Sequence, residues 1–179
     1  MRHIPNIISG LRLIMVGIFA HFFIAANYVA CIGVYLLAFF SDLLDGYLAR
    51  RNNWISDIGK VLDPLADKLM LLTAVLCFYL KGWLPMYMFI IIFAKEGLML
   101  VGGMLLLKKG VVVFADWFGK FAAGFFTASV IVTLLKNFAP FERIGSFNLI
   151  LFGIAIILAL IALVHYAKIQ VFSRHNTQE

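Results

Sequence analysis

Apolar stretches of about 20 residues, separated by short polar connections, follow one another along almost the whole chain. A helix of that length is what crosses a hydrocarbon core of about 30 Å. Turn signals separate the stretches at Lys81–Pro85, Lys109–Gly110 and Ala139–Pro140. The pattern predicts an all-α integral membrane protein that forms a single membrane-embedded domain over residues 1–179. Its six transmembrane helices are predicted at about 7–27, 29–51, 60–80, 84–107, 115–135 and 146–172.

Composition and charge agree with a membrane protein and indicate its orientation. Hydrophobic residues make up 64% of the 179 residues and charged residues only 13%, which excludes an ordinary soluble domain. The net charge of +6 comes from residues that flank the predicted spans, so it favours lipid headgroups over nucleic acid as the partner. With six spans both termini share a side. That side holds Arg2, Arg50, Arg51, Lys60, Lys108, Lys109, Lys168 and Arg174, whereas the opposite loops hold Lys81, Lys136 and Arg143, which predicts cytoplasmic termini.

Charged residues inside the predicted spans are the candidates for chemistry, because an unpaired charge in a bilayer costs several kcal/mol. The acidic ones are Asp42, Asp45, Asp63, Asp67 and Glu96, and the basic ones are Arg12, Lys68, Lys95 and Lys120. All are expected in the cytoplasmic half of the membrane. Lys68 is expected to be an interior partner of the carboxylates.

The four aspartates have helical spacing on two consecutive spans. At about 100° per residue, Asp42 and Asp45 fall on one face of the second span, and Asp63 and Asp67 lie one turn apart on the third. We therefore expect the four carboxylates to meet between two antiparallel helices. Such a cluster needs a cation, and oxygen ligands beside a phosphate substrate suit one or two Mg²⁺ or Mn²⁺ ions.

The aspartates belong to a longer pattern, D-x2-D-G-x2-A-R-x8-G-x3-D-x3-D, which begins at Asp42 and ends at Asp67. This pattern resembles the signature of the CDP-alcohol phosphotransferase family at all of its fixed positions. The resemblance implies metal binding by Asp42, Asp45 and Asp63, and general-base catalysis by Asp67, which is also a possible metal ligand. The family's reaction transfers a phosphatidyl group from a CDP-activated lipid to a hydroxyl group and releases CMP.

The remaining signature residues have a physical reason to contact the CDP part of the donor. Gly46, Ala49 and Gly59 let a nucleotide diphosphate approach the helix backbone, and Arg50 supplies a positive fork for phosphate. With Asp42 they form the expected donor-binding set. Taken singly, the small residues are also typical of helix packing in membranes, and Arg50 is also typical of a membrane-flanking anchor.

The acceptor is expected to be glycerol-3-phosphate. The opening Pro5-Asn6-Ile-Ile-Ser9-Gly-Leu-Arg12 and the run from Leu62 to Lys68 resemble family members that make phosphatidylglycerophosphate and cardiolipin. Arg12, Lys95 and Lys120 are the candidate ligands of the acceptor's phosphate. Lys95 stands where phosphatidylglycerophosphate synthases usually have Arg, and Gly103 stands where they carry a second Arg. An alternative role for Lys95 and Lys120 is a structural ion pair with Glu96 or Asp116.

Other functions remain open at this stage. A cardiolipin synthase, with phosphatidylglycerol as acceptor, resembles the fourth span equally well because it too lacks the second Arg. A carboxylate-lined metal transporter is a distant alternative, because the chain shows neither a clear inverted repeat nor broken helices. The resemblance also implies a homodimer. We expect the bacterial cytoplasmic membrane as the location, with the active site facing the cytoplasm.

Overall fold

The computed structural model describes the backbone of residues 4–52, 59–108, 117–138 and 146–175. Within these ranges it describes the side chains of residues 8–44, 65–104, 117–138 and 146–165. This part of the chain is entirely helical and contains no strand. The all-α fold class predicted from the sequence is confirmed.

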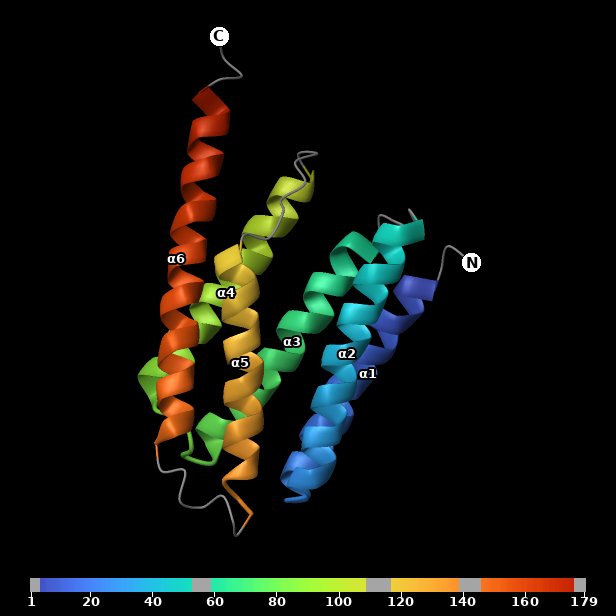
Figure 1. The fold of residues 1–179 in the computed structure, drawn as a ribbon, viewed down its shortest axis with the longest axis vertical. Helices are drawn as coiled ribbons and strands as arrows, with labels where there is room; N and C mark the ends of the chain where they lie inside the picture. Colours follow the sequence, from blue (N-terminus) through green and yellow to red (C-terminus); the bar gives the residue numbers. More distant parts are fainter. Residues whose placement is uncertain (1–3, 53–58, 109–116, 139–145, 176–179) are drawn as a thin grey trace.

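The described residues form six helices, and their bounds differ from the predicted ones by only a few residues. They are α1 (Ile4–Ile24), α2 (Tyr28–Asn52), α3 (Gly59–Leu80), α4 (Met86–Lys108), α5 (Trp117–Leu135) and α6 (Phe147–His175). Successive helices run in opposite directions, so the start of α1 and the end of α6 lie at the same end of the bundle (Figure 1).

Two helices end in the same tight turn, closed by one residue in a left-handed conformation. At the end of α3, Gly82 (φ 72°) takes that position, and the Trp83 amide donates to the Phe78 carbonyl at 2.8 Å. At the end of α1 the position is taken by Ala26 (φ 55°). A non-glycine residue in this conformation costs roughly 1–2 kcal/mol. Because alanine, unlike glycine, does not mark such a position in a sequence, this turn carries no sequence signal. The first helix was predicted to continue to about residue 27 and instead ends at Ile24.

The packing places α1 between its two neighbours. Helix α1 contacts both α2 and α3 extensively, while α2 and α3 touch each other only slightly. Helices α5 and α6 form a second close pair, and α4 packs against α3 and α6. Helix α1 lies against both of them and contributes its own residues to the site, while the expected meeting of the four carboxylates between α2 and α3 stays a prediction, because Asp45 and Asp63 lie outside the described side chains.

Aromatic rings fill the core at the end of the bundle opposite the aspartates. Phe23, Tyr28, Phe78 and Trp83 contact one another with ring centroids 5.3–5.9 Å apart. Phe23 and Phe78 come from the ends of α1 and α3, Tyr28 starts α2, and Trp83 lies in the turn after α3. Because large rings bury much apolar area, this cluster fixes that end of the three helices.

The outer surface is apolar, as expected of a protein whose solvent is lipid. In the described part of the chain, three helices are long and apolar enough to cross a membrane: Met86–Met104, Trp117–Leu135 and Phe147–His165. The segments Ile8–Ile24 and Tyr28–Leu44 are shorter apolar helices. Large apolar side chains such as Ile24, Phe40 and Leu98 are more than half exposed. These features support an integral membrane protein.

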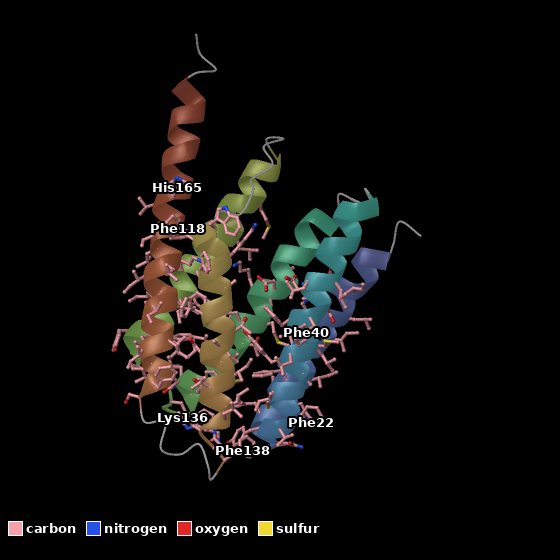
Figure 2. The ribbon with its side chains drawn as sticks, in the orientation of Figure 1. Phe22, Phe40, Phe118, Lys136, Phe138 and His165 are labelled. Atoms are coloured by element: carbon pink, nitrogen blue, oxygen red, sulfur yellow. The ribbon has the colours of Figure 1, made fainter. Side chains whose placement is uncertain are left out.

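A buried chain of hydrogen bonds joins α5 to α6 close to their connection. The Lys136 ammonium donates to the Asn148 amide oxygen at 3.3 Å, and the Asn148 amide nitrogen donates to the Thr133 hydroxyl at 3.1 Å. Thr133 in turn donates to the Ser129 carbonyl at 2.7 Å. Figure 2 shows Lys136 at this end of the bundle, away from the predicted active site. Asn148 is the central member, since it contacts both of the other helix-end side chains.

Asn148→Leu is expected to destabilise the protein without changing its chemistry. The substitution keeps the size of the side chain but leaves the Thr133 hydroxyl and the Lys136 ammonium without this partner, a loss of about 1–3 kcal/mol. The apparent Tm in detergent, followed by far-ultraviolet circular dichroism, should fall. An unchanged Tm would show that this hydrogen-bond chain contributes nothing to stability.

Candidate active site

Arg12 and Asp42 form an ion pair that links α1 to α2. The Arg12 Nη1 donates to Asp42 Oδ1 at 2.7 Å. The Arg12 side chain is only 1% exposed, whereas Asp42 is 36% exposed. A buried guanidinium requires such a counter-ion, because an isolated charge in the interior is strongly unfavourable. Arg12, predicted to bind the acceptor, therefore contacts one of the predicted metal ligands.

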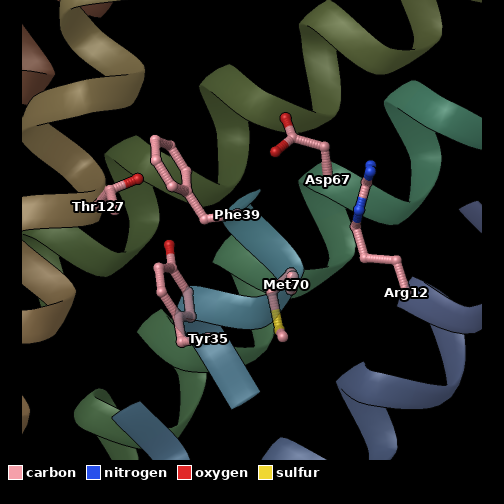
Figure 3. Close-up of a pocket in the computed structure, with 7 residues that line it drawn as sticks. Arg12, Tyr35, Phe39, Asp67, Met70 and Thr127 are labelled. Carbon is pink, nitrogen blue, oxygen red and sulfur yellow. The ribbon is translucent and has the colours of Figure 1, made fainter. Parts of the chain in front are cut away.

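Asp67 lies beside Arg12 on a small cavity between α1, α2, α3 and α5. The cavity has a volume of about 30 Å³ and is lined by Arg12, Tyr35, Ala38, Phe39, Asp67, Met70 and Thr127. Figure 3 shows Asp67 and Arg12 on one side of it and Tyr35, Phe39 and Thr127 on the other. Tyr35 on α2 and Thr127 on α5 both line this cavity, so the site also reaches α5. The Asp67 side chain is 55% exposed, so it is accessible to a substrate.

A second cluster of charges connects α3 to α4. The Glu96 side chain, 1% exposed, lies between two ammonium groups. Lys68 Nζ is 2.6 Å from Glu96 Oε2, and Lys95 Nζ donates to Glu96 Oε1 at 2.7 Å. Lys68 Nζ is also 3.9 Å from Asp67 Oδ2. The expected role of Lys68 as an interior partner of the carboxylates is confirmed, and so is the alternative reading of Lys95 as a partner of Glu96.

Lys120, the third candidate for acceptor binding, has a different environment. Its side chain is exposed at the start of α5, and its ammonium lies 4.9 Å from the centre of the Trp117 ring. A cation over an aromatic face is held weakly at an exposed site. Lys120 thus keeps its charge available at the same end of the bundle as the aspartates. The alternative partner proposed for it, Asp116, lies outside the described residues.

Much of the predicted donor site lies outside the described side chains. The backbone of α2 and α3 places these residues on the helices as predicted, but their side-chain contacts are not described. They are Asp45, Gly46, Ala49, Arg50, Gly59 and Asp63. Their predicted roles in metal and donor binding stay predictions.

Comparison with known proteins assigns the chain to a family. A sequence profile of the CDP-alcohol phosphatidyltransferase family matches residues 2–167. The chain belongs to this family. A CDP-diacylglycerol--glycerol-3-phosphate 3-phosphatidyltransferase of Aquifex aeolicus is 28% identical over 166 residues, which cover 92% of this chain and 93% of that protein. The protein of the same name from Treponema pallidum is 30% identical over 149 residues, 78% of this chain and 69% of that protein.

A relative that is named for a different activity is also similar to this chain. A cardiolipin synthase (CMP-forming) of Streptomyces coelicolor is 36% identical over 104 residues, which cover 55% of this chain and 48% of that protein. The resemblance inferred from the signature is confirmed, and the chain is an enzyme of the CDP-alcohol phosphatidyltransferase family.

Two described carboxylates of this CDP-alcohol phosphatidyltransferase lie on the helices that carry the predicted metal site. Asp42 on α2 and Asp67 on α3 offer only oxygen atoms, and Arg12 lies beside both of them. Asp45 and Asp63 follow or precede them by one helical turn. Among the described residues no group of three or more acidic, histidine or cysteine side chains converges, since these two aspartates are not among them. The predicted set of four carboxylates would suit Mg²⁺ or Mn²⁺, and binding of either ion stays a prediction.

Three residues of the transferase site were not assigned a role from the sequence. Glu96 was among the charged residues predicted inside the spans and was a possible partner of Lys95 or Lys120, but its specific contact with Lys68 was not predicted. Tyr35 and Thr127 had no signal beyond being polar groups inside apolar spans. A search for hydroxyl groups inside apolar spans at the depth of the aspartates would have selected Tyr35 and Thr127.

Proposed function

We propose that this enzyme transfers the phosphatidyl group of CDP-diacylglycerol to glycerol-3-phosphate and releases CMP. The observation that carries the proposal is the position of Asp67: an accessible carboxylate beside Arg12, with Lys68 and Lys95 held nearby by Glu96. A base and fixed positive charges at one place suit an acceptor that carries both a hydroxyl and a phosphate. Two relatives, similar over 93% and 69% of their own lengths, are named for this activity.

In the proposed reaction, an acceptor oxygen attacks the phosphorus that bears the diacylglycerol. A new phosphorus–oxygen bond forms, the bond to the bridging oxygen of the pyrophosphate breaks, and CMP leaves with the electron pair. Asp67 takes the proton of the attacking hydroxyl. Asp42, Asp45, Asp63 and Asp67 would hold one or two Mg²⁺ or Mn²⁺ ions, which neutralise the charge of the pyrophosphate when bound.

The remaining residues bind and orient the two substrates. Gly46, Ala49, Arg50 and Gly59, with Asp42, would hold the CDP part of the donor. Lys95, Lys120 and Arg12 would act on the acceptor's phosphate, with Lys120 the most accessible of the three. Arg12 also holds Asp42 in place at 2.7 Å. The diacylglycerol chains would remain in the surrounding lipid, next to the apolar outer surface.

The setting of the enzyme is part of the proposal. The basic residues at the aspartate end favour a cytoplasmic active site and cytoplasmic termini in a bacterial cytoplasmic membrane. A homodimer is proposed from the family resemblance, with weak support from the small residues Gly119 and Ala123 on α5.

Cardiolipin synthesis, with phosphatidylglycerol as acceptor, is the second candidate. The observation that favours it is Gly103, which replaces a second phosphate-binding Arg. A Cβ added at Gly103 would meet no heavy atom within 4 Å, so packing against the described side chains does not exclude a larger residue there. The partial similarity to a cardiolipin synthase agrees with this alternative.

An assay of acceptor choice separates the two candidates. Purified enzyme with CDP-diacylglycerol and Mg²⁺ or Mn²⁺ is expected to release CMP when glycerol-3-phosphate is added and not when phosphatidylglycerol is added. Assays without an acceptor measure background hydrolysis, and assays with chelator test the metal requirement. CMP release only with phosphatidylglycerol would overturn the proposal in favour of cardiolipin synthesis, and no release with either would contradict both.

A further inference from the structure

Glu96 is the most deeply buried carboxylate among the described residues, and each of its two oxygens lies next to the ammonium of a different lysine. Its Oε2 atom is 2.6 Å from the Lys68 ammonium on α3, and its Oε1 atom accepts a hydrogen bond of 2.7 Å from the Lys95 ammonium on α4. Glu96 is 1% exposed and Lys95 is also buried. One carboxylate therefore serves two cations within the bundle.

This arrangement can fix both lysine side chains only while Glu96 is charged and in place. Two ammonium groups near one point repel each other, and in a surrounding of low polarity that repulsion is poorly screened. Loss of the shared carboxylate leaves the buried Lys95 and the partly buried Lys68 without this counter-ion, which is unfavourable until they move apart. The long, flexible lysine side chains can make such a movement, so their positions depend on Glu96.

The two lysines lie where the proposed reaction needs fixed positive charge. Lys68 follows Asp67 directly in the chain, and its ammonium is 3.9 Å from Asp67 Oδ2, farther than from Glu96. Lys95 is a proposed ligand of the acceptor's phosphate. Since α3 packs against α4, the shared carboxylate joins the helix with the proposed base to the helix with the proposed acceptor ligand.

We infer that Glu96 is a positioning residue, which orients Lys95 for the acceptor's phosphate while holding Lys68 beside Asp67. The inference rests on the proposed function, since it deepens the description of the same acceptor site. Glu96 itself does not contact the substrates. Its effect on the reaction passes through the two lysines, and chiefly through Lys95 in acceptor binding.

The test is Glu96→Gln, which preserves the shape of the side chain and removes its charge. The KM for the acceptor is expected to rise at least about tenfold, because a charged hydrogen bond that orients Lys95 is lost. The KM for CDP-diacylglycerol should stay within about twofold of the wild-type value, since the donor contacts other residues. Glu96→Asp keeps the charge on a shorter side chain and should recover part of the acceptor affinity.

Asn148→Leu is the matched control for a merely structural role. Asn148 is also a buried polar residue that joins two helices, but it lies at the opposite end of the bundle. Asn148→Leu should lower the Tm with no change in the KM for the acceptor or for CDP-diacylglycerol. If Glu96→Gln behaves in the same way, or raises both KM values equally, the inference is wrong. If Glu96→Gln does not fold, the same comparison of the two KM values is made with Glu96→Asp.

A double-mutant cycle with Lys95→Met identifies the route of the effect. In the Lys95→Met background, Glu96→Gln should change the acceptor KM much less than it does in the wild type, because the lysine that it orients is gone. Additive effects would overturn the inference. Every measurement uses the acceptor that the wild-type enzyme accepts. Activity with phosphatidylglycerol alone would thus refute glycerol-3-phosphate as substrate while still testing Glu96.

Discussion

Asp67→Asn is expected to lower CMP release by about 100- to 10,000-fold while CDP-diacylglycerol still binds. The amide has the size of the carboxylate but cannot take the proton of the attacking hydroxyl. Asp67 is accessible and lies beside Arg12. The ion pair between Arg12 and Asp42 is made by other atoms, so we expect it to persist in Asp67→Asn. Single-turnover CMP release and equilibrium binding of the donor measure the two effects separately.

The control for Asp67 is its longer homologue. Asp67→Glu keeps a carboxylate at an exposed position, so it should fold normally and retain more activity than Asp67→Asn. The assignment of Asp67 as the general base would fail if Asp67→Asn turned over within about threefold of the wild type. A large loss of donor binding in Asp67→Asn would instead indicate that its main contribution is as a metal ligand.

Asp42→Asn is expected to weaken metal and donor binding together and to lower activity by at least about 100-fold at a fixed Mg²⁺ concentration. A neutral amide is a poorer ligand for a hard divalent cation than a carboxylate. The concentration of Mg²⁺ needed for half-maximal activity should rise strongly, and the KM for CDP-diacylglycerol should rise with it. Titrations of Mg²⁺ at several donor concentrations measure both effects.

The contact between Asp42 and Arg12 makes a second effect of this substitution unavoidable. Arg12 is buried, and it would lose the charge of its partner at 2.7 Å, so the Tm is expected to fall as well. A purely structural role would lower the Tm and the amount of active enzyme but leave the half-saturating Mg²⁺ concentration unchanged. That outcome would remove Asp42 from the set of metal ligands.

The described charges form two groups that meet at Asp67. On one side Arg12 joins α1 to the aspartate face of α2, and on the other Glu96 joins α3 to α4 through Lys68 and Lys95. Each buried charge in these groups has an opposite charge close by, as the low polarity of a membrane interior requires. These two groups of charges therefore join four helices, α1 to α4.

The succession of apolar stretches could be read as six helices because a helix is the structure that satisfies every backbone hydrogen bond within one segment in lipid. The signature from Asp42 to Asp67 identified the family because its residues are fixed by chemistry at helical spacing. The turn at Gly82 was visible in the sequence because glycine is the usual residue in the left-handed position after a helix. Ala26 adopts the same conformation but gave no such signal.

The sequence by itself thus determined the number and type of the helices, the family and the charged residues available for chemistry. Only the tertiary structure decided how those charges pair: Arg12 with Asp42, and Glu96 with both Lys68 and Lys95. Helical periodicity states which residues share a face of one helix, but not which faces of two helices meet. The packing of α1 against both α2 and α3 is such a meeting, and it brings Arg12 to the aspartates.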